Sequence, residues 1–534
     1  MALLYRFVKI PDRADTHVFT FIVTKSVTRD LERDITSKEF SCGHQRWAIT
    51  FSRTDKVLGV YLVWRSTSDA MRVYVDFTFT LLNRDHFSYN EAFSGKQVKF
   101  TTECPAQGNR NYIAVSELYV RNFADHNGEF QLELSMGHVR TMFDTDFRVP
   151  SSIFGHHLPR NHHQNPAKNP PQTNKMETTY FTYGGFDWNL ALYPNGIKDI
   201  HDGRVSVYLN RCTGFDHQCR VRYSLVLGDG PRRVDSGPVD DVSDSDGKSY
   251  GWHTSSRFQD LVYKGAVRVH LEMLMANTLS EVVSTIVVQH AAAATAAAGS
   301  SGAAAAPAGG THGVVVAAPA VTQCYDRDKQ AWSIKSDCHS ETVRLHMVYK
   351  DIHNVPRNHL RYVCWMAYLL KYDEDSREMV PKALPGAPFS HYYAQENSDE
   401  GIIMETDVGV KELKEPGCPY LTDKGQMRVQ VVWSESYLLF QASYHKYDDV
   451  TRTQNHQMRR EIQTLQAENY SLERQLFSYQ KSIAYAHSRG TYSYDLQTPD
   501  GRPEEEEDPY PFEERGYHHH GLGDRTMSSD TEYA

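Results

Sequence analysis

The chain has 534 residues, of which 40% are hydrophobic and 23% are charged, values typical of globular domains. Its formal net charge is −10, but residues 490–534 hold twelve acidic and three basic side chains and so carry −9 of it. The near-neutral remainder offers no basic surface for nucleic acid or an anionic membrane, and the length predicts three or four domains.

The eight cysteines are scattered, and no two of them form a CxxC pair. This spacing favours reduced thiols over a zinc site or a disulfide framework, so we expect a cytoplasmic protein, with the cell cortex and the nucleus left open. The first fifteen residues have too short an apolar run for a secretory signal. No segment approaches the roughly 20 apolar residues of a membrane span, so we expect a soluble protein.

Alternating apolar side chains predict a β-rich domain over residues 17–136. The clearest strand runs from Met71 to Asn83, where every second residue is apolar, and similar runs occur at Leu58 to Trp64 and Phe130 to Met136. Several short strands with polar turns and no long helical period predict an antiparallel sandwich.

Strand patterns resume in a second expected domain, residues 137–278, at Phe186 to Gly196, Arg204 to Asn210, Cys219 to Gly230 and Ala266 to Met275. Between the two sets lies a segment rich in His, Pro and Asn, residues 155–175, which predicts an extended disordered loop. Its four histidines allow a metal site in principle, but compositional bias is the favoured interpretation, and we predict no metal. The four are His156, His157, His162 and His163.

Residues 279–321 are rich in Ala, Gly and Pro and predict a flexible linker, because glycines and prolines oppose a continuous helix. We therefore expect the domains on either side to move independently. A third strand-rich block follows at residues 322–448, with strands around Ala331 to Lys335, Thr342 to Asp351, Leu360 to Tyr372 and Met427 to Trp433.

The order of these features resembles the meprin-and-TRAF-homology (MATH) family. SKEFSCGHQRWAITFS, GVYLVW and VDFTFTLLN carry the resemblance in the first block; YFTYGGFDWNLALYPNG, VSVYL, YSLVLGDG and VRVHLEM carry it in the second. AWSIK, RLHMVY and PYLTDKGQMRVQVVW carry it in the third. The resemblance implies an all-β fold of two to three tandem antiparallel TRAF-like sandwiches.

Domains of this family bind short extended peptides, commonly beside an exposed edge strand, and better-known members line that groove with aromatic side chains. At the matching positions this chain has Val57 and Phe77 in the first domain and Arg204, Val221 and Trp252 in the second. Most of the aromatic shelf is therefore missing, and the family's familiar peptide motif is not expected to bind. Plain core packing is the favoured alternative for Phe77 and Trp252.

Residues 455–484 change to helical periodicity, with apolar side chains alternately four and three residues apart. The pattern predicts a coiled coil, and a polar Asn at one core position favours a parallel homodimer over a trimer. A single amphipathic helix packed on a neighbouring domain is the alternative. The predicted seam consists of Met458, Ile462, Leu465, Asn469, Leu472, Leu476, Tyr479 and Ile483.

Residues 490–534 are acidic and proline-containing, which predicts a disordered tail. Five tyrosines in this part of the chain are candidate phosphorylation sites, although a merely solubilising tail is the favoured interpretation. They are Tyr492, Tyr494, Tyr510, Tyr517 and Tyr533.

The sequence contains no phosphate-binding loop, nucleophile elbow, HExxH helix or kinase motif, so we expect no enzyme and no cofactor. The leading hypothesis is a signalling adaptor or scaffold that binds partner proteins or short peptides through its MATH-like sandwiches. One alternative is a substrate receptor that works with a ubiquitin ligase through a partner. The other is a structural spacer of the cell cortex or cytoskeleton.

Overall fold

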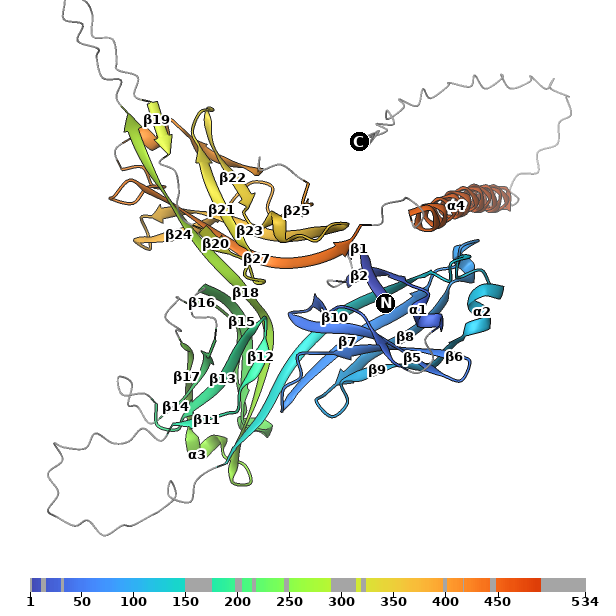
Figure 1. The fold of residues 1–534 in the computed structure, drawn as a ribbon, viewed down its shortest axis with the longest axis horizontal. Coiled ribbons are helices and arrows are strands. Elements are labelled where there is room, and N and C mark those ends of the chain that lie inside the picture. The colour runs from blue at the N-terminus through green and yellow to red at the C-terminus, as the bar shows by residue number, and fades with distance from the viewer. Residues whose placement is uncertain are drawn as a thin grey trace, which may run out of the picture. The chain divides into compact units, whose positions relative to one another are not determined.

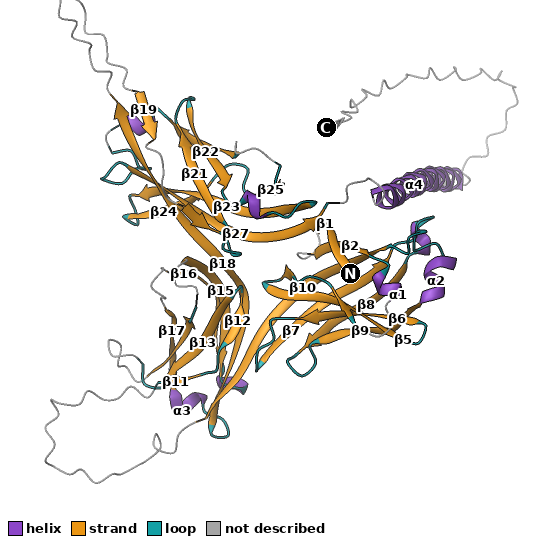
Figure 2. Cartoon of the chain, in the orientation of Figure 1, coloured by secondary structure: helices purple, strands orange, loops and turns teal. Residues whose placement is uncertain are grey.

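The computed structural model describes residues 2–10, 16–29, 33–148, 175–196, 204–213, 218–243, 249–289, 314–317, 323–396, 401–415, 417–441 and 448–490. These residues form antiparallel sheets, a few short helices and one long helix, so the all-β prediction with a C-terminal helix is confirmed (Figure 2). The chain divides into two compact units, Met1–Arg459 and Arg460–Ala534.

The first block (residues 2–137) contains one part of a large sheet, in the order β1-β2-β10-β7-β8, and a small sheet in the order β3-β5-β6-β9 with β4 beside β5. Its elements are β1 (Ala2–Ile10), β2 (Thr16–Val23), α1 (Ser26–Arg29), β3 (Ile35–Thr36), β4 (Phe40–Cys42), β5 (Gln45–Thr54), β6 (Val57–Trp64), β7 (Met71–Leu81), η1 (Phe87–Tyr89), β8 (Glu91–Phe100), β9 (Ala106–Ala114), α2 (Val115–Val120) and β10 (Phe130–Arg148).

The second block (residues 138–278) continues the large sheet as β10-β18-β15-β16 and adds a small sheet in the order β11-β13-β14-β17, with β12 beside β13. Its elements are β11 (Met176–Glu177), β12 (Phe181–Tyr183), β13 (Phe186–Tyr193), β14 (Arg204–Arg211), β15 (Gln218–Leu227), η3 (Gly230–Arg232), β16 (Val234–Ser243), β17 (Ser249–Arg257), α3 (Phe258–Leu261) and β18 (Ala266–Gln289).

The third block (residues 279–440) extends the large sheet as β18-β27-β23, with β24 and β25 beside β23, and has a small sheet in the order β20-β21-β22-β26. Its elements are β19 (Val314–Ala317), β20 (Gln323–Tyr325), β21 (Ala331–Asp337), β22 (Thr342–Tyr349), η4 (Ile352–Asn354), β23 (His359–Asp373), β24 (Glu378–Ala383), β25 (Phe389–Tyr393), β26 (Ile402–Gly409), η5 (Glu412–Lys414) and β27 (Gln426–Phe440). The long helix α4 (Asp448–Gly490) follows.

A buried tryptophan occupies the same place in the small sheet of every block, on β5, β13 and β21. Trp47, Trp188 and Trp332 are each 0% exposed. The indole N–H of Trp47 donates to the carbonyl of Cys42, and that of Trp188 donates to the carbonyl of Tyr183. In the first and second blocks the accepting carbonyl lies five residues before the tryptophan. The two blocks therefore contain the same short hairpin, closed by the same indole hydrogen bond.

The two sheets of a block share one apolar core. In the first block the Trp47 ring lies 5.1 Å from the Phe100 ring of the large sheet, and in the third block Trp332 lies 5.1 Å from Trp433. Alternate positions of each strand face this core, as in β7, where every second residue from Met71 to Leu81 is buried.

Two long strands belong to two blocks each. Residues 130–136 of β10 pair with β2 in the first block, and residues 141–148 of the same strand pair with β18. β18 in turn pairs with β15 in the second block and, over residues 279–285, with β27 of the third block (Figure 1). Residues 279–289, expected in the flexible linker, therefore form a strand that pairs with the third block over 279–285, and Val282 and Ile286 are buried in the core of that block.

The end of β27 returns to the first block by side-chain contacts. The hydroxyl of Tyr437 donates to the carbonyl of Ser41 at 3.0 Å, and its ring lies 4.5 Å from that of Phe7. The Nζ of Lys9 lies 3.3 Å from Oε1 of Glu435. The third block is therefore tied to the first block as well as to the second.

The hairpin turns that precede Trp47, Trp188 and Trp332 meet in what we call the junction. It is formed by residues 42–45, 183–186 and 325–330. The first two turns have positive φ at both central residues, 58° and 62° at Gly43 and His44 and 65° and 85° at Gly184 and Gly185. The N–H of Gly184 donates to the carbonyl of His44 at 3.1 Å. A Cβ at Gly185 would lie 3.3 Å from Nε of Arg327, so glycine allows the third turn to approach closely.

Candidate functional site

Each small sheet ends in an edge strand, β9 in the first block, β17 in the second and β26 in the third. These strands pair on one side with β6, β14 and β22, and within the described ranges no strand pairs with their other side. An edge strand presents backbone N–H and C=O groups to which another extended segment can add. The three edge strands are therefore candidate binding surfaces.

All three edge strands show a register irregularity against their neighbour. The shifts fall between Leu58 and Val60 on β6, between Arg204 and Ser206 on β14, and between Thr342 and Arg344 on β22. An extra residue in one strand bends an edge and increases its twist, which limits unspecific edge-to-edge pairing.

A tyrosine lies opposite a glycine of the edge strand in two of the blocks. Tyr61 is paired in register with Gly108 of β9, and Tyr208 is paired with Gly251 of β17. A Cβ at Gly251 would lie 2.2 Å from Cε1 of Tyr208, so the ring covers the glycine. In the third block Ile403 of β26, which is 50% exposed, stands opposite His346.

Polar aromatic side chains gather beside β17. The Tyr193 and Tyr208 rings lie 5.5 Å apart edge to face, and Nε2 of His253 lies 3.3 Å from the Tyr208 hydroxyl. Nδ1 of His253 lies 2.9 Å from the hydroxyl of Ser206. Burial raises the pKa of Tyr208, so its hydroxyl remains a hydrogen-bond donor at neutral pH. These aromatic residues lie outside the positions that the family resemblance indicated.

The two groove residues predicted in the first block lie apart, on different sheets. Val57 is the first residue of β6, half-buried, and stands opposite Ala114 of the edge strand β9. Phe77 belongs to the large sheet, is 3% exposed, and packs against Phe79 at a ring distance of 5.6 Å. Phe77 is therefore a core residue, and of this pair Val57 alone adjoins the edge strand.

Of the three groove residues predicted in the second block, two lie at the edge strand. Trp252 is part of β17 and is half-buried against the core, whereas the exposed Arg204 stands opposite Arg257 of β17. Val221 is 0% exposed on β15 of the large sheet. Val221 is buried because it lies on the face of β15 that packs against the core. The residue type at one position does not show which face of a strand it occupies.

The predicted coiled-coil residues all lie on α4, which begins before and ends after the expected range 455–484. In the single chain they form an exposed apolar stripe, with 37% exposure at Met458 and between 54% and 69% at Ile462, Leu465, Leu472, Leu476, Tyr479 and Ile483. Asn469 is exposed as well. Apolar side chains at this spacing form one face of the helix, interrupted by Asn469.

The start of α4 is anchored on the first block. Gln454 is 5% exposed; its Nε2 donates to the carbonyl of Asn83, and its Oε1 accepts from Nδ2 of Asn90 at 3.2 Å. Val450, one turn earlier, is 7% exposed. The first turns of the helix therefore pack on the loop after β7, while the seam residues from Ile462 onward are exposed.

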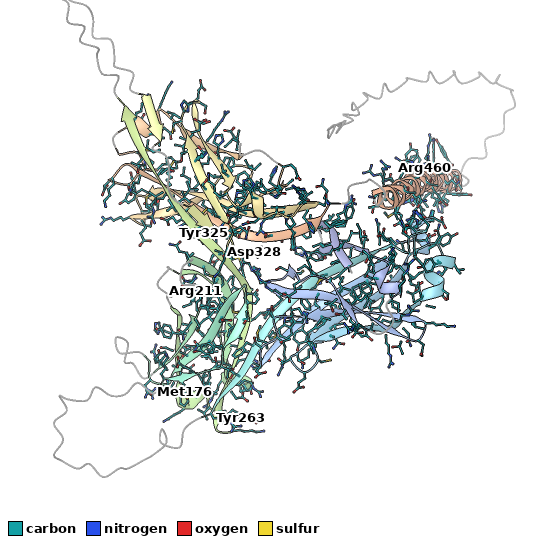
Figure 3. The ribbon with its side chains drawn as sticks, in the orientation of Figure 1. Met176, Arg211, Tyr263, Tyr325, Asp328 and Arg460 are labelled. Atoms are coloured by element: carbon teal, nitrogen blue, oxygen red, sulfur yellow. The ribbon has the colours of Figure 1, made fainter. Side chains whose placement is uncertain are left out.

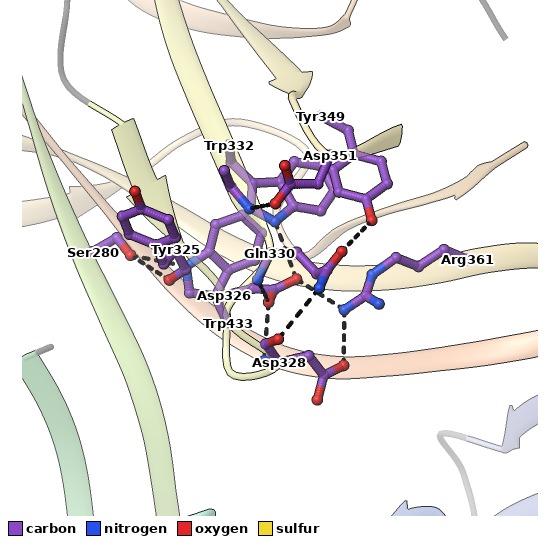
Figure 4. Close-up of polar contacts among 11 residues, drawn as sticks. Ser280, Tyr325, Asp326, Asp328, Gln330, Trp332, Tyr349, Asp351, Arg361 and Trp433 are labelled. Atoms are coloured by element: carbon purple, nitrogen blue, oxygen red, sulfur yellow. Dashed lines mark hydrogen bonds and ion pairs between the residues drawn. The ribbon is translucent and has the colours of Figure 1, made fainter. Parts of the chain in front are cut away.

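The turn between β20 and β21 carries a buried ion pair, close to the labelled Tyr325 and Asp328 in Figure 3. Nη2 of Arg361 lies 3.1 Å from Oδ2 of Asp326 and 2.8 Å from Oδ2 of Asp328 (Figure 4). The Asp326 side chain is 2% exposed and also accepts from the indole of Trp332 at 3.0 Å. Burial raises the pKa of Asp326, and Arg361 opposes that rise.

A cavity of about 420 Å³, the junction cavity, lies where the junction meets β1, β2 and β27. Its lining includes Lys9, His17, Cys42, Arg327, Trp433 and Glu435. These residues come from the first and third blocks, hundreds of positions apart, so no local sequence signal could have assembled them.

Several predicted features lie outside the described residues. They are the four histidines of the loop 155–175, the residues 290–313 and 318–321 of the expected linker, and the five tail tyrosines Tyr492, Tyr494, Tyr510, Tyr517 and Tyr533.

Within the described residues, no group of three or more His, Cys, Asp or Glu side chains is placed to hold a metal ion. No helix in the same residues is both long enough and apolar enough to cross a bilayer. The sequence matches no family model, and a search of curated proteins finds no significant match.

Proposed function

We propose that this chain is a non-enzymatic cytoplasmic adaptor built from three tandem TRAF-like β-sandwiches. Each sandwich binds an extended segment of a partner protein or a short peptide beside its edge strand, and two copies of the chain pair through residues 455–484. The observation that carries the proposal is the threefold recurrence of an edge strand, β9, β17 and β26, whose outer side is unpaired within the described residues.

Backbone hydrogen bonds to an edge strand supply affinity with little sequence preference, and neighbouring side chains supply selectivity. The second block has the richest set of such side chains, with Tyr208 and His253 beside β17. Of the two predicted groove residues at this edge, Trp252 belongs to β17 and Arg204 stands opposite Arg257 of the same strand. We therefore assign the principal peptide site to β17 and expect weaker sites at β9 and β26.

Pairing of two chains through α4 would double the number of edge strands and increase binding to partners that offer two or more segments. The exposed stripe on α4 supports this pairing, because apolar side chains at alternating spacings of four and three become buried when two such helices associate.

Selection of displayed random peptides on the full chain, followed by hydrogen exchange of the complex, tests the proposal. A selected peptide should slow exchange of amides in β17, and His253→Ala should weaken its binding. His346→Ala on the third block, where no tyrosine faces the edge strand, is the matched control. Protection confined to other strands, or equal weakening by both substitutions, would refute the assignment.

A second function is favoured by the strands shared between blocks. Because β10 and β18 each pair in two blocks and β27 contacts the first, residues 2–441 are suited to act as a rigid structural spacer. Small-angle scattering tests the rigidity that the spacer requires. A spacer predicts one particle shape that is independent of temperature and denaturant up to unfolding, and a broad distribution of distances would refute it.

A further inference from the structure

Three side chains from distant strands form a row along the junction cavity. Sγ of Cys42, on β4, lies 3.8 Å from Nδ1 of His17, on β2. Nε2 of His17 lies 3.0 Å from Oε1 of Glu435, on β27. All three line the same cavity, and Lys9 approaches the same Oε1 at 3.3 Å.

This order of groups activates a thiol. A carboxylate beside Nε2 favours the tautomer that carries its proton there, which leaves the Nδ1 lone pair directed at the thiol. The imidazole can then take the thiol proton, and the carboxylate stabilises the imidazolium that results.

The electrostatics of the row favour that transfer. Burial disfavours the charged imidazole, but the contacts with Cys42 and Glu435 outweigh it and raise the pKa of His17 to about 10. Burial likewise opposes ionisation of Glu435, yet His17 and Lys9 lower the pKa of that carboxyl below its usual value. At neutral pH the proton therefore lies on His17, as an imidazolium next to the Cys42 sulfur.

The cavity gives small molecules a route to this thiol. Its volume of about 420 Å³ falls within the range of small-molecule pockets, whereas the Cys42 side chain itself is only 3% exposed. The charges of Lys9, His17 and Glu435 are paired with one another, so a small uncharged molecule suits the part of the cavity next to Cys42, while the Arg327 guanidinium also belongs to the lining.

We propose that Cys42 is a nucleophilic thiol that small hydroperoxides oxidise inside the junction cavity. His17 takes the proton from Sγ, and the sulfur attacks the terminal oxygen of the hydroperoxide. A sulfur–oxygen bond forms as the oxygen–oxygen bond breaks, and the leaving alkoxide receives the proton from His17. Sulfur is oxidised to sulfenic acid and the hydroperoxide is reduced to an alcohol, or to water when it is hydrogen peroxide.

Other cysteines provide internal comparisons. Cys104 is exposed, and its sulfur accepts from Nε2 of Gln107 rather than facing an imidazole. Burial raises the pKa of Cys219 and of Cys324 to about 12, which makes both thiols poor nucleophiles. Faster oxidation of the buried Cys42 than of the exposed Cys104 would therefore measure activation of the thiol and not its accessibility to the peroxide.

The test is to treat the full chain at pH 7 with limiting hydrogen peroxide, trap sulfenic acid with dimedone, and quantify each cysteine by mass spectrometry. An ordinary cysteine is only a few per cent thiolate at this pH, so full activation is worth about 30-fold at most. Cys42 should react about 10- to 30-fold faster than Cys104, and His17→Gln should remove that difference.

His138→Gln is the matched control, because His138 lines the same cavity but pairs with Asp76 at 3.0 Å. Glu435→Gln is a second variant that keeps a hydrogen-bond acceptor and removes the charge, and it should give an intermediate rate. Folding of each variant is checked by circular dichroism. Labelling of Cys42 that is no faster than that of Cys104, or that His17→Gln and Glu435→Gln leave unchanged, would overturn the proposal.

Discussion

Replacement of Arg361 by methionine should destabilise the third block by leaving a buried carboxylate without its cation. Asp326 is 2% exposed and lies 3.1 Å from the guanidinium, a distance at which two unit charges attract by about 5 kcal/mol at an effective dielectric constant of 20. Breaking a buried pair by removing one partner costs about 3–5 kcal/mol. The Asp326 carboxylate retains backbone N–H bonds from Asp328 and Gln330, so we expect about 3 kcal/mol.

The loss should depend on pH in a definite direction. The folded state already raises the pKa of Asp326 because burial disfavours its charge, and removal of Arg361 raises it further. A raised folded pKa contributes stability at low pH that is lost as pH rises through that value. Arg361→Met should therefore cost most at pH 7 and above and progressively less toward pH 4.

Thermal unfolding of the full chain, followed by tryptophan fluorescence at several pH values, measures this loss. The matched comparison is the double variant Arg361→Met with Asp326→Asn, which removes both charges and should be more stable than Arg361→Met at pH 7. Equal melting temperatures for the single variant and the wild type, or a loss that does not change between pH 4 and 7, would refute the reasoning.

Three further predictions concern other parts of the chain. Leu465→Asp should reduce the mass measured by light scattering from two chains to one, whereas Ala467→Asp, on the outer side of the predicted coil, should not. In denaturant titrations Gly108→Ala should lower the free energy of unfolding by about 1–3 kcal/mol, and by more than Gly251→Ala does. A Cβ at Gly108 would lie 2.0 Å from the Val60 carbonyl, which is backbone, whereas a Cβ at Gly251 would meet the Tyr208 ring, which can move. The pKa of His17 is raised from 6.5 to about 10 in the folded protein, so its ion pair with Glu435 contributes its full stability below pH 6.5 and loses it as the pH rises through 10. The difference in melting temperature between wild type and Glu435→Gln should therefore shrink as the pH approaches 10.

Local periodicity is enough to predict the β class and many of the long strands, but not the three edge strands β9, β17 and β26. β7 shows why: its side chains alternate between core and exterior, so Val73, Val75 and Phe79 stand out in the sequence as they do in the fold. The helix was equally clear, since the apolar spacing of four and three residues from Met458 to Ile483 fits a helix and not a strand. Patterns of this kind depend only on residues within one helix or strand, so the sequence of that element is enough to show them.

Contacts between distant strands could not be predicted in the same way. The ion pair of Lys9 with Glu435 joins residues 426 positions apart, and neither residue stands out in its own segment. β1 lies outside the predicted first domain because its pattern is short, and it joins the sheet by pairing with β2. The strand at 279–289 was assigned to a linker because an Ala-rich segment follows it directly, and only its pairing with β27 distinguishes the two.

The connection of the blocks changes what the adaptor proposal requires. In a flexible row of sandwiches, three weak sites would search for partners independently, and their combined affinity would fall as the linkers lengthen. Strands shared by adjacent blocks fix the spacing of β9, β17 and β26 within residues 2–441, so a partner must present its binding segments at matching distances to engage more than one. Selectivity would then come from the spacing of segments on the partner as well as from their sequence. Side-chain contacts alone hold β27 against the first block. One of these contacts joins Glu435 to His17, next to Cys42. A change at that thiol would therefore act on the spacing between the first and third blocks, and so between β9 and β26, rather than on a single edge strand.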